Sequence, residues 1–347
     1  MRIGIVNDLP IAREAIRRVV VSNSCFKIAW MANDGAEGVR QALQDKPDLI
    51  LMDLIMPVLD GVEATRQIMS ENPCPILVVT ATVAGHLSKV YEAMGLGALD
   101  AVDTPTFGRD HDLLGGQPLL RKIETIAKLI GAQRNTDAPE SHFRKTCLGA
   151  GGVPPLIAIG ASTGGPAAIA EILGAFPTGV KSTIILIQHI DSSLAGGLAL
   201  WLSEKTGHRV KVAAAGHRVQ AGEILLSGTN DHMILREGRS LDYSREPEEL
   251  NYRPSVNLFF ESLKQHWPDP GIAVLLTGMG ADGARGLLAL KKSGWMTFAQ
   301  DESTSVVYGM PREAAKLGAA CHILPIHRIG TTIRDQLALH SRGKDHA

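Results

Sequence analysis

The stretch "DLILMDL" (residues 48–54) is a short apolar run that ends at an acidic residue, Asp53. Apolar side chains at successive positions are typical of a central parallel strand, which is covered on both faces. Similar runs occur at residues 3–6, 28–31 and 76–81, and helix-like segments at 11–21 and 35–44 lie between them. Strands that alternate with helices predict a doubly wound parallel sheet, a flavodoxin-like α/β domain over residues 1–105.

A second alternation begins near Leu156. Its apolar runs lie at residues 156–159, 183–187, 223–226, 272–276 and 295–299, and a hairpin with Glu237-Gly238 at its turn is expected over 232–244. Residues 154–340 are therefore predicted to form a second doubly wound α/β domain, Rossmann-like and three-layered. Residues 106–153 are expected to be a polar, Gly- and Pro-containing linker with one helix near Pro118–Ile130.

The bulk composition excludes several classes of protein. A formal net charge of −1 over 347 residues gives no general attraction to nucleic acid or to anionic membranes. No apolar run reaches about 18 residues, so no membrane insertion is expected, and the N-terminal run is too short for a signal peptide. The four cysteines (Cys25, Cys74, Cys147 and Cys321) show no C-x-x-C spacing, which argues against a zinc site or a disulfide framework. A cytoplasmic protein is expected.

Polar residues follow three of the predicted strands in the first domain. Asp8 comes after the first, Asp53 ends the run at 48–52, and Thr80 ends the run at 76–79. Ligands of open α/β sheets bind at the carboxyl ends of the strands, and two carboxylates there suit Mg²⁺ and phosphoryl chemistry. Acidic residues after strands often only begin loops, so each residue alone is weak evidence.

The surrounding pattern strengthens this interpretation. "MDLIMPVLDG" (52–61) resembles the signature of response-regulator receiver domains. The resemblance implies that Asp53 accepts a phosphoryl group, that Mg²⁺ is held by Asp8, Asp53 and the carbonyl of Ile55, and that Thr80 supplies the switch hydroxyl.

Two positions depart from the receiver pattern. Asn7-Asp8 stands where the family has two acids, so one negative charge is lost and weaker Mg²⁺ binding is expected. Thr104-Pro105 stands where the family has Lys-Pro, so the cation that contacts the phosphoryl group is missing.

The second domain contains "IGASTGGP" (159–166), which reads G-x-S-x-G around Ser162. A serine nucleophile needs a base and a group that orients this base. His189 and Asp282 each follow an apolar run, as Ser162 does, so parallel strands would bring all three to one sheet edge. The helix expected after Gly165-Pro166 would offer N–H groups to an oxyanion.

Some other interpretations of this turn are excluded by the sequence, and others remain open. The absence of a lysine after Gly165 excludes a P-loop, and Gly160-Ala161-Ser162 breaks the dinucleotide fingerprint. A purely structural glycine turn remains open. An α/β-hydrolase elbow would require the order Ser162, Asp282, His322, although His322 lies among apolar neighbours and is expected in an edge strand.

Three motifs together resemble the catalytic domain of the CheB family of chemotaxis protein-glutamate methylesterases. They are "IGASTGGP", "IQHI" (187–190) and "LLTGMGADGARG" (275–286), and the receiver precedes them as in that family. The resemblance implies Ser162 as the nucleophile, His189 as the general base and Asp282 as its orienting acid. Thr163 and Met279 would line the site with backbone donors for the oxyanion, and no metal is needed there.

The family implies hydrolysis of glutamate γ-methyl esters on methyl-accepting chemoreceptors, and possible glutamine deamidation. It also implies a histidine kinase of the CheA type as phosphodonor, and an unphosphorylated receiver that covers the catalytic face. "ILLSGTNDHMIL" (224–235) departs from the family's Ala-Pro-Gly run, while Asn7-Asp8 and "VDTPT" (102–106) are similar to Wsp-type methylesterases of surface sensing. The rival classes are a receiver-regulated generic serine esterase and a non-catalytic, phosphorylation-dependent docking protein.

Overall fold

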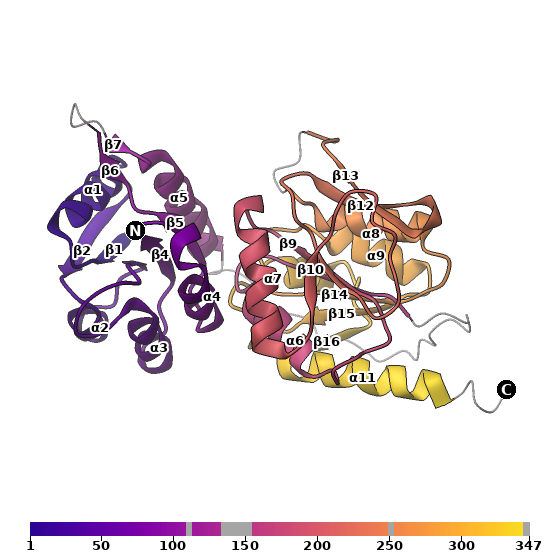
Figure 1. Cartoon of the computed structure of the whole chain (residues 1–347). Helices are drawn as coiled ribbons and strands as arrows, with labels where there is room; N and C mark the ends of the chain where they lie inside the picture. Colours follow the sequence, from indigo (N-terminus) through magenta and orange to yellow (C-terminus); the bar gives the residue numbers. More distant parts are fainter. Residues whose placement is uncertain (109–112, 133–154, 249–252, 343–347) are drawn as a thin grey trace. The chain divides into compact units, whose positions relative to one another are not determined.

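The chain forms two compact units, Met1–Thr136 and Asp137–Ala347, and each contains its own parallel sheet (Figure 1). A computed structural model describes residues 1–108, 113–132, 155–248 and 253–342. Residues 109–112 and 133–153 of the expected linker lie outside the described residues. Both units have the predicted α/β architecture.

The first unit is built on a five-stranded parallel sheet of order β2-β1-β3-β4-β5. Its strands are β1 Arg2–Val6, β2 Lys27–Ala32, β3 Leu49–Met52, β4 Ile76–Thr80 and β5 Asp100–Asp103. The "DLILMDL" run contains β3, which is central and buried at every position, as a strand covered on both faces requires. The carboxyl ends of β1, β3 and β4 lead to Asp8, Asp53 and Thr80.

Helices cover both faces of this sheet. They are α1 Pro10–Val21, α2 Gly35–Gln44, α3 Gly61–Glu71, α4 Leu87–Gly95, which follows the 3₁₀ turn η1 Ala84–His86, and α5 Gly116–Ala132. Helix α1 packs against α5, and α3 packs against both α2 and α4, so the two groups lie on opposite faces (Figure 1).

The helix that was expected within the linker is α5, which follows the small hairpin β6 Thr106–Phe107 and β7 Leu113–Leu114. It buries Leu119, Ile123 and Ile126 against the first unit. Lys122 on this helix also binds the Asp100 carboxylate of β5 at 2.6 Å. Residues 116–132 therefore belong structurally to the first unit.

The second unit contains a seven-stranded parallel sheet of order β10-β11-β9-β8-β14-β15-β16. The strands are β8 Ile157–Ala161, β9 Ile184–Gln188, β10 Val210–Val212, β11 Ile224–Leu226, β14 Ile272–Leu275, β15 Met296–Gln300 and β16 His322–Leu324. The chain moves from β8 outward through β9 in one direction, and later from β14 outward in the other. The carboxyl ends of β8 and β14 therefore flank the switch point, where ligands of such sheets bind.

Helices form the two outer layers of this unit. They are α6 Gly165–Gly174, α7 Ser192–Thr206, α8 Val256–His266, α9 Ala284–Lys292, α10 Met310–Lys316 and α11 Ile326–Arg342. Helix α6 packs against α7 and α11 on one face, and α9 packs against α8 and α10 on the other (Figure 1). None of the helices in the described parts of the chain combines the length and the apolar character that a membrane span needs.

The predicted hairpin over 232–244 is present. Strands β12 His232–Arg236 and β13 Ser240–Ser244 pair in antiparallel register, and the 3₁₀ turn η2 Glu237–Arg239 joins them. Gly238 has φ of +71° there, a conformation that favours glycine. Strand β12 packs on α8, so the hairpin holds that helix near the switch point.

Candidate active site

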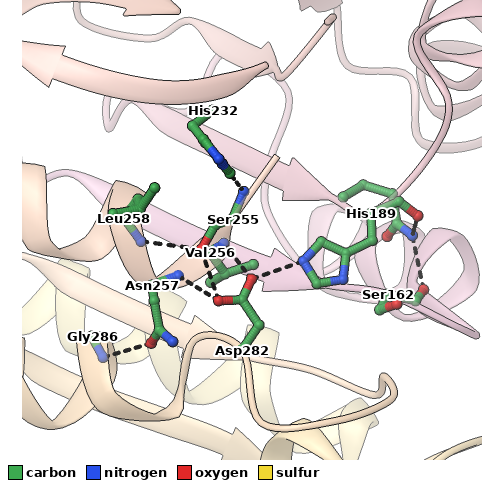
Figure 2. A network of polar contacts seen from close by, with 10 residues as sticks. Ser162, His189, His232, Ser255, Val256, Asn257, Leu258, Asp282 and Gly286 are labelled. Carbon is green, nitrogen blue, oxygen red and sulfur yellow. Dashed lines mark hydrogen bonds and ion pairs between the residues drawn. The ribbon is translucent and has the colours of Figure 1, made fainter. Parts of the chain in front are cut away.

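Ser162, His189 and Asp282 lie at the carboxyl ends of three adjacent parallel strands. Ser162 directly follows β8, His189 directly follows β9, and Asp282 lies between β14 and α9. Strand β8 pairs with β9 on one side and with β14 on the other. The predicted parallel arrangement is confirmed. It brings three residues that are spread over 120 positions of the sequence to one sheet edge (Figure 2).

Backbone hydrogen bonds hold the turn that contains Ser162. The Ser162 N–H donates to the carbonyl of Thr277 at 3.1 Å, and its carbonyl accepts from the N–H of Gly165 at 2.7 Å. Gly164 has φ of +76°, and a Cβ there would lie 2.6 Å from Val306. Only glycine fits this position, from which the ten-residue helix α6 begins with Pro166 in its first turn.

His189 and Asp282 form a closely paired base and acid. Nε2 of His189 lies 2.9 Å from Oδ2 of Asp282, and both side chains are largely buried. A carboxylate accepts hydrogen bonds, so Nε2 carries the proton in the neutral imidazole and Nδ1 presents its lone pair. In Figure 2 the imidazole ring lies between Asp282 and Ser162. The arrangement can therefore draw a proton from a serine hydroxyl toward Nδ1.

Asp282 is held by the first turn of α8. Its carboxylate accepts from Ser255 Oγ at 2.9 Å, from the Val256 N–H at 2.6 Å and from the Asn257 N–H at 3.1 Å (Figure 2). Burial raises the pKa of this carboxyl, but the hydrogen bonds and charge of His189 and the two backbone donors outweigh it, so the pKa is lowered. The positive end of the helix adds to the same effect. Asp282 is thereby kept ionised and oriented.

Sequence reasoning did not identify Ser255, or His232, which contacts Ser255. Ser255 is the N-cap of α8 and also accepts from the Leu258 N–H. Its own N–H donates to Nδ1 of the fully buried His232 at 3.1 Å, and Nε2 of His232 lies 3.3 Å from the carbonyl of Pro247. The signal in the sequence was the N-cap pattern of a serine before an apolar helical segment.

Thr163 directly follows Ser162, and Met279 lies in the loop between β14 and α9. The Thr163 carbonyl accepts from the Thr277 hydroxyl at 2.9 Å, which joins the nucleophile turn to the loop that contains Met279. Gly278 lies so close that a Cβ there would stand 2.6 Å from Cβ of Ser162 and 2.4 Å from Sδ of Met310. This close approach places the two loops in direct contact at the serine.

The alternative base, His322, is not brought to this site. It begins the edge strand β16, and β15 separates that strand from β14. Its ring stacks on Phe298 with centroids 4.9 Å apart, and burial lowers its pKa. The order Ser162, Asp282, His322 is therefore not assembled in this sheet.

In the first unit, Asp53 directly follows β3 and is nearly buried. Its carboxylate accepts from the Asn7 amide at 2.9 Å and from the Leu54 N–H at 2.7 Å. Burial raises the pKa of Asp53 and the charge of Asp8 adds to this, while the hydrogen bond from the Leu54 N–H acts in the opposite direction. A Cβ on Gly61 would lie 1.8 Å from the Asp53 carbonyl, so glycine is required beside it.

These residues suit a hard divalent cation. Mg²⁺ is usually held by one or two carboxylates together with carbonyls and waters. Asp8 and Asp53 supply two carboxylates, and Ile55 can supply a carbonyl. No larger group of His, Cys, Asp or Glu that could hold a metal occurs within the described residues.

The two departures from the receiver pattern have visible consequences. Oδ1 of Asn7 accepts from the Leu9 N–H at 2.9 Å, and this bond directs the amide nitrogen toward Asp53. Asn7 therefore presents a donor to the carboxylate, where an acid would add charge. Thr104 binds the Thr80 carbonyl through its N–H and brings no cation to this edge.

Comparison with known proteins decides the family. A family model described as "CheB methylesterase" matches residues 157–333, and one described as "Response regulator receiver domain" matches residues 3–110. A protein-glutamate methylesterase/protein-glutamine glutaminase of Cupriavidus metallidurans is 50% identical over 329 residues, which cover 95% of this chain and 96% of that protein. This chain belongs to the CheB methylesterase family. It is an ester hydrolase with a receiver domain.

Two further matches agree with this assignment. A protein of the same description from Mesorhizobium japonicum is 50% identical over 336 residues, which cover 96% of this chain and 98% of that protein. The crystal structure of the Thermotoga maritima CheB methylesterase catalytic domain is 29% identical and has a TM-score of 0.50. It covers 53% of this chain and 98% of that structure.

The methylesterase departs from its family's pattern just before the His232-Met233 pair. In this segment Oδ1 of Asn230 accepts from the Ser192 N–H at 2.8 Å, and its amide lies 3.3 Å from the Asp191 carboxylate. Asp191 is the N-cap of α7, two residues after His189. This segment is thus attached to the surface beside the base.

Proposed function

We propose that this methylesterase hydrolyses glutamate γ-methyl esters on methyl-accepting chemoreceptors, and that phosphorylation of Asp53 controls it. The observation that carries the chemistry is the His189–Asp282 pair at 2.9 Å beside Ser162 on the neighbouring strand end. The names of the similar proteins support the substrate class.

The reaction begins with attack of Ser162 Oγ on the ester carbonyl carbon while Nδ1 of His189 takes the hydroxyl proton. Asp282 stays ionised and stabilises the imidazolium that forms. Backbone N–H groups of Thr163 and Met279, near the start of α6, receive the developing oxyanion. His189 then returns the proton to the leaving methoxide, and methanol departs.

Hydrolysis of the glutamyl-enzyme follows the reverse proton path. His189 takes a proton from water, the hydroxide attacks the acyl carbon, and Ser162 regains its proton as the glutamate side chain leaves. Glutamine side chains fit the same sequence with ammonia as the leaving group, in line with the second activity in the relatives' names. None of these steps uses a metal.

Control is proposed to arise in the receiver. Asp53 accepts the phosphoryl group from a histidine kinase of the CheA type, and Thr80 follows the modified aspartate as the switch hydroxyl. Asp8, Asp53 and the Ile55 carbonyl would hold Mg²⁺, which when bound offsets the charge of the transferring phosphoryl group. Phosphorylation then shifts the population from a covered to an open catalytic face.

The test uses the full chain with membranes that contain methylated chemoreceptor, with and without acetyl phosphate. We expect methanol release that requires Ser162 and that acetyl phosphate increases through Asp53. Full release by Ser162→Ala would disprove the catalytic role and favour a docking protein. Hydrolysis of small esters without receptor demethylation would favour a generic esterase. Release that needs Ser162 but ignores Asp53→Asn would remove the switch and keep the chemistry.

A further inference from the structure

Gln188 is the last residue of β9 and stands next to the base, but the proposed mechanism gives it no role. Its side chain is 2% exposed. Its amide nitrogen donates to the carbonyl of Ser162 at 2.8 Å and to that of His189 at 3.2 Å. One buried amide therefore joins the nucleophile turn on β8 to the residue that supplies the base on β9.

The bond to Ser162 sets the orientation of a peptide group. In a trans peptide the C=O and the following N–H point in opposite directions. The Ser162 carbonyl is held inward by two donors, the Gln188 amide and the Gly165 N–H at 2.7 Å. The N–H of Thr163 must then point away from the buried Gln188 side chain. Thr163 itself is partly exposed, so this donor is turned toward the open side of the turn.

The carbonyl oxygen of the Gln188 amide, Oε1, lowers the stability of the fold. Oε1 is buried and has no hydrogen-bond partner among the described residues. It lies where a Cβ on Gly165 would come within 2.0 Å, so the glycine is what admits it. A buried acceptor without a partner destabilises the fold, so the side chain is not explained by stability alone.

We propose that Gln188 is a positioning residue: its amide nitrogen locks the Ser162–Thr163 peptide so that the Thr163 N–H is preset to receive the oxyanion. This inference rests on the acyl transfer proposed above. Oxyanion donors act because they are already oriented when charge develops on the substrate. Loss of the Gln188 amide would let the peptide rotate and would remove part of that preorganisation.

The test compares the full chain with Gln188→Met, which keeps the side-chain length but has no donor, and with Gln188→Glu, which at pH 8 places a carboxylate opposite the Ser162 carbonyl. Thr297→Val is the matched control. Thr297 lies on β15 and is fully buried, and its hydroxyl donates to the Ala319 carbonyl at 2.8 Å. Two rates are measured: methanol release from methylated receptor, and labelling by an alkyl fluorophosphonate. In labelling, a bond forms between Ser162 Oγ and phosphorus, fluoride leaves, and His189 takes the proton.

We expect kcat and the labelling rate of both Gln188 variants to fall by about 10²-fold, the order of loss for one oxyanion donor. For Gln188→Met, the KM for receptor and the pH midpoint of labelling should stay as in the wild type, because this variant adds no charge beside His189. Gln188→Met should unfold near the wild-type temperature, since it also removes the unpaired Oε1. Thr297→Val should label at the wild-type rate.

Three results would overturn the inference. They are rates within threefold of the wild type, a pH midpoint that shifts in the uncharged variant Gln188→Met and so indicates a displaced base, or a loss that Thr297→Val shares at equal change in unfolding temperature. Labelling needs no receptor. A wild type that is labelled at Ser162 but releases no methanol would therefore refute the proposed substrate, while the variants' labelling rates would still decide the role of Gln188.

Discussion

Nε2 of His189, and not Nδ1, lies 2.9 Å from the Asp282 carboxylate. The proton of the neutral imidazole is therefore on the side of the acid, and Nδ1 is the atom that can act as the base. The hydrogen bonds that Asp282 receives from the start of α8 fix the position of its two oxygens, so the acid is held in place opposite Nε2.

The identity of the base is tested by two histidine variants. His189→Ala should lower kcat by more than about 10³-fold, since removal of a triad base removes most of the catalysis. His322→Ala should keep near-normal turnover, because β15 separates its strand from that of Asp282. Methanol release from methylated receptor measures both. A loss only in His322→Ala would reverse the assignment.

Replacement of the orienting acid tests the role of Asp282. Asp282→Asn should lower kcat by about 10³–10⁴-fold, because an amide permits the wrong tautomer of His189. Steady-state kinetics at saturating receptor measure this change. A loss of less than tenfold would remove Asp282 from the mechanism.

Asp282 also predicts a pH dependence of stability. Its pKa in the folded chain lies below its ordinary value of 3.8, so its ionised form stabilises the fold above pH 3.8. This contribution is lost as the pH falls through the folded-state pKa. The difference in free energy of unfolding between wild type and Asp282→Asn should narrow as the pH falls below 3.8, as measured by urea denaturation. A difference that widens in acid would contradict the lowered pKa.

Ser255 supports Asp282 and caps α8. Ser255→Ala should destabilise the second unit by about 1 kcal/mol, as loss of an N-cap does. It should also lower kcat by roughly tenfold, because a loosened acid orients the base less well. Ser262→Ala is the control, since Ser262 lies on the same helix and its hydroxyl accepts from the Leu235 N–H and donates to the Phe259 carbonyl. Equal losses of activity in the two variants would indicate general destabilisation.

Gly278 tests how closely the two loops must approach. Gly278→Ala should lower kcat by about 10²-fold, since the added methyl would meet Cβ of Ser162 and displace the nucleophile. Gly174→Ala is the matched control on α6, where a Cβ meets no atom within 4 Å. Fluorophosphonate labelling follows Ser162 directly. Unchanged labelling of Gly278→Ala would show that the turn tolerates the displacement.

Replacement of Asn7 tests the proposed Mg²⁺ site of the receiver domain. Asn7→Asp should increase Mg²⁺ affinity roughly tenfold, because a third carboxylate strengthens the attraction for the cation. The variant should be less stable than the wild type without Mg²⁺, since it replaces a hydrogen bond to Asp53 with repulsion. Calorimetric titration and thermal unfolding measure the two effects, with Asp8→Asn as the variant expected to weaken binding. Equal Mg²⁺ affinity in all three proteins would place the metal elsewhere.

The sequence by itself determined the architecture and the strand ends at which the candidate catalytic residues meet. Local periodicity was sufficient for both sheets, because buried parallel strands are short apolar runs whatever lies beside them. The same logic placed Ser162, His189 and Asp282 together, since residues after parallel strands emerge at one edge. The hairpin turn at Gly238 was also readable, because it depends on residues adjacent in the chain.

Tertiary structure alone decided how those residues are held. Ser255 bonds Asp282 and is itself held by His232, a link that depends on the packing of α8 on β12, and nothing in a local window records that contact. The choice of Nε2 over Nδ1 and the amide bridge of Gln188 depend on side-chain directions set by packing between strands. The assignment of α5 to the first unit depends on the same kind of contact. Periodicity encodes which side of an element is buried, whereas the partner that buries it is fixed by long-range packing.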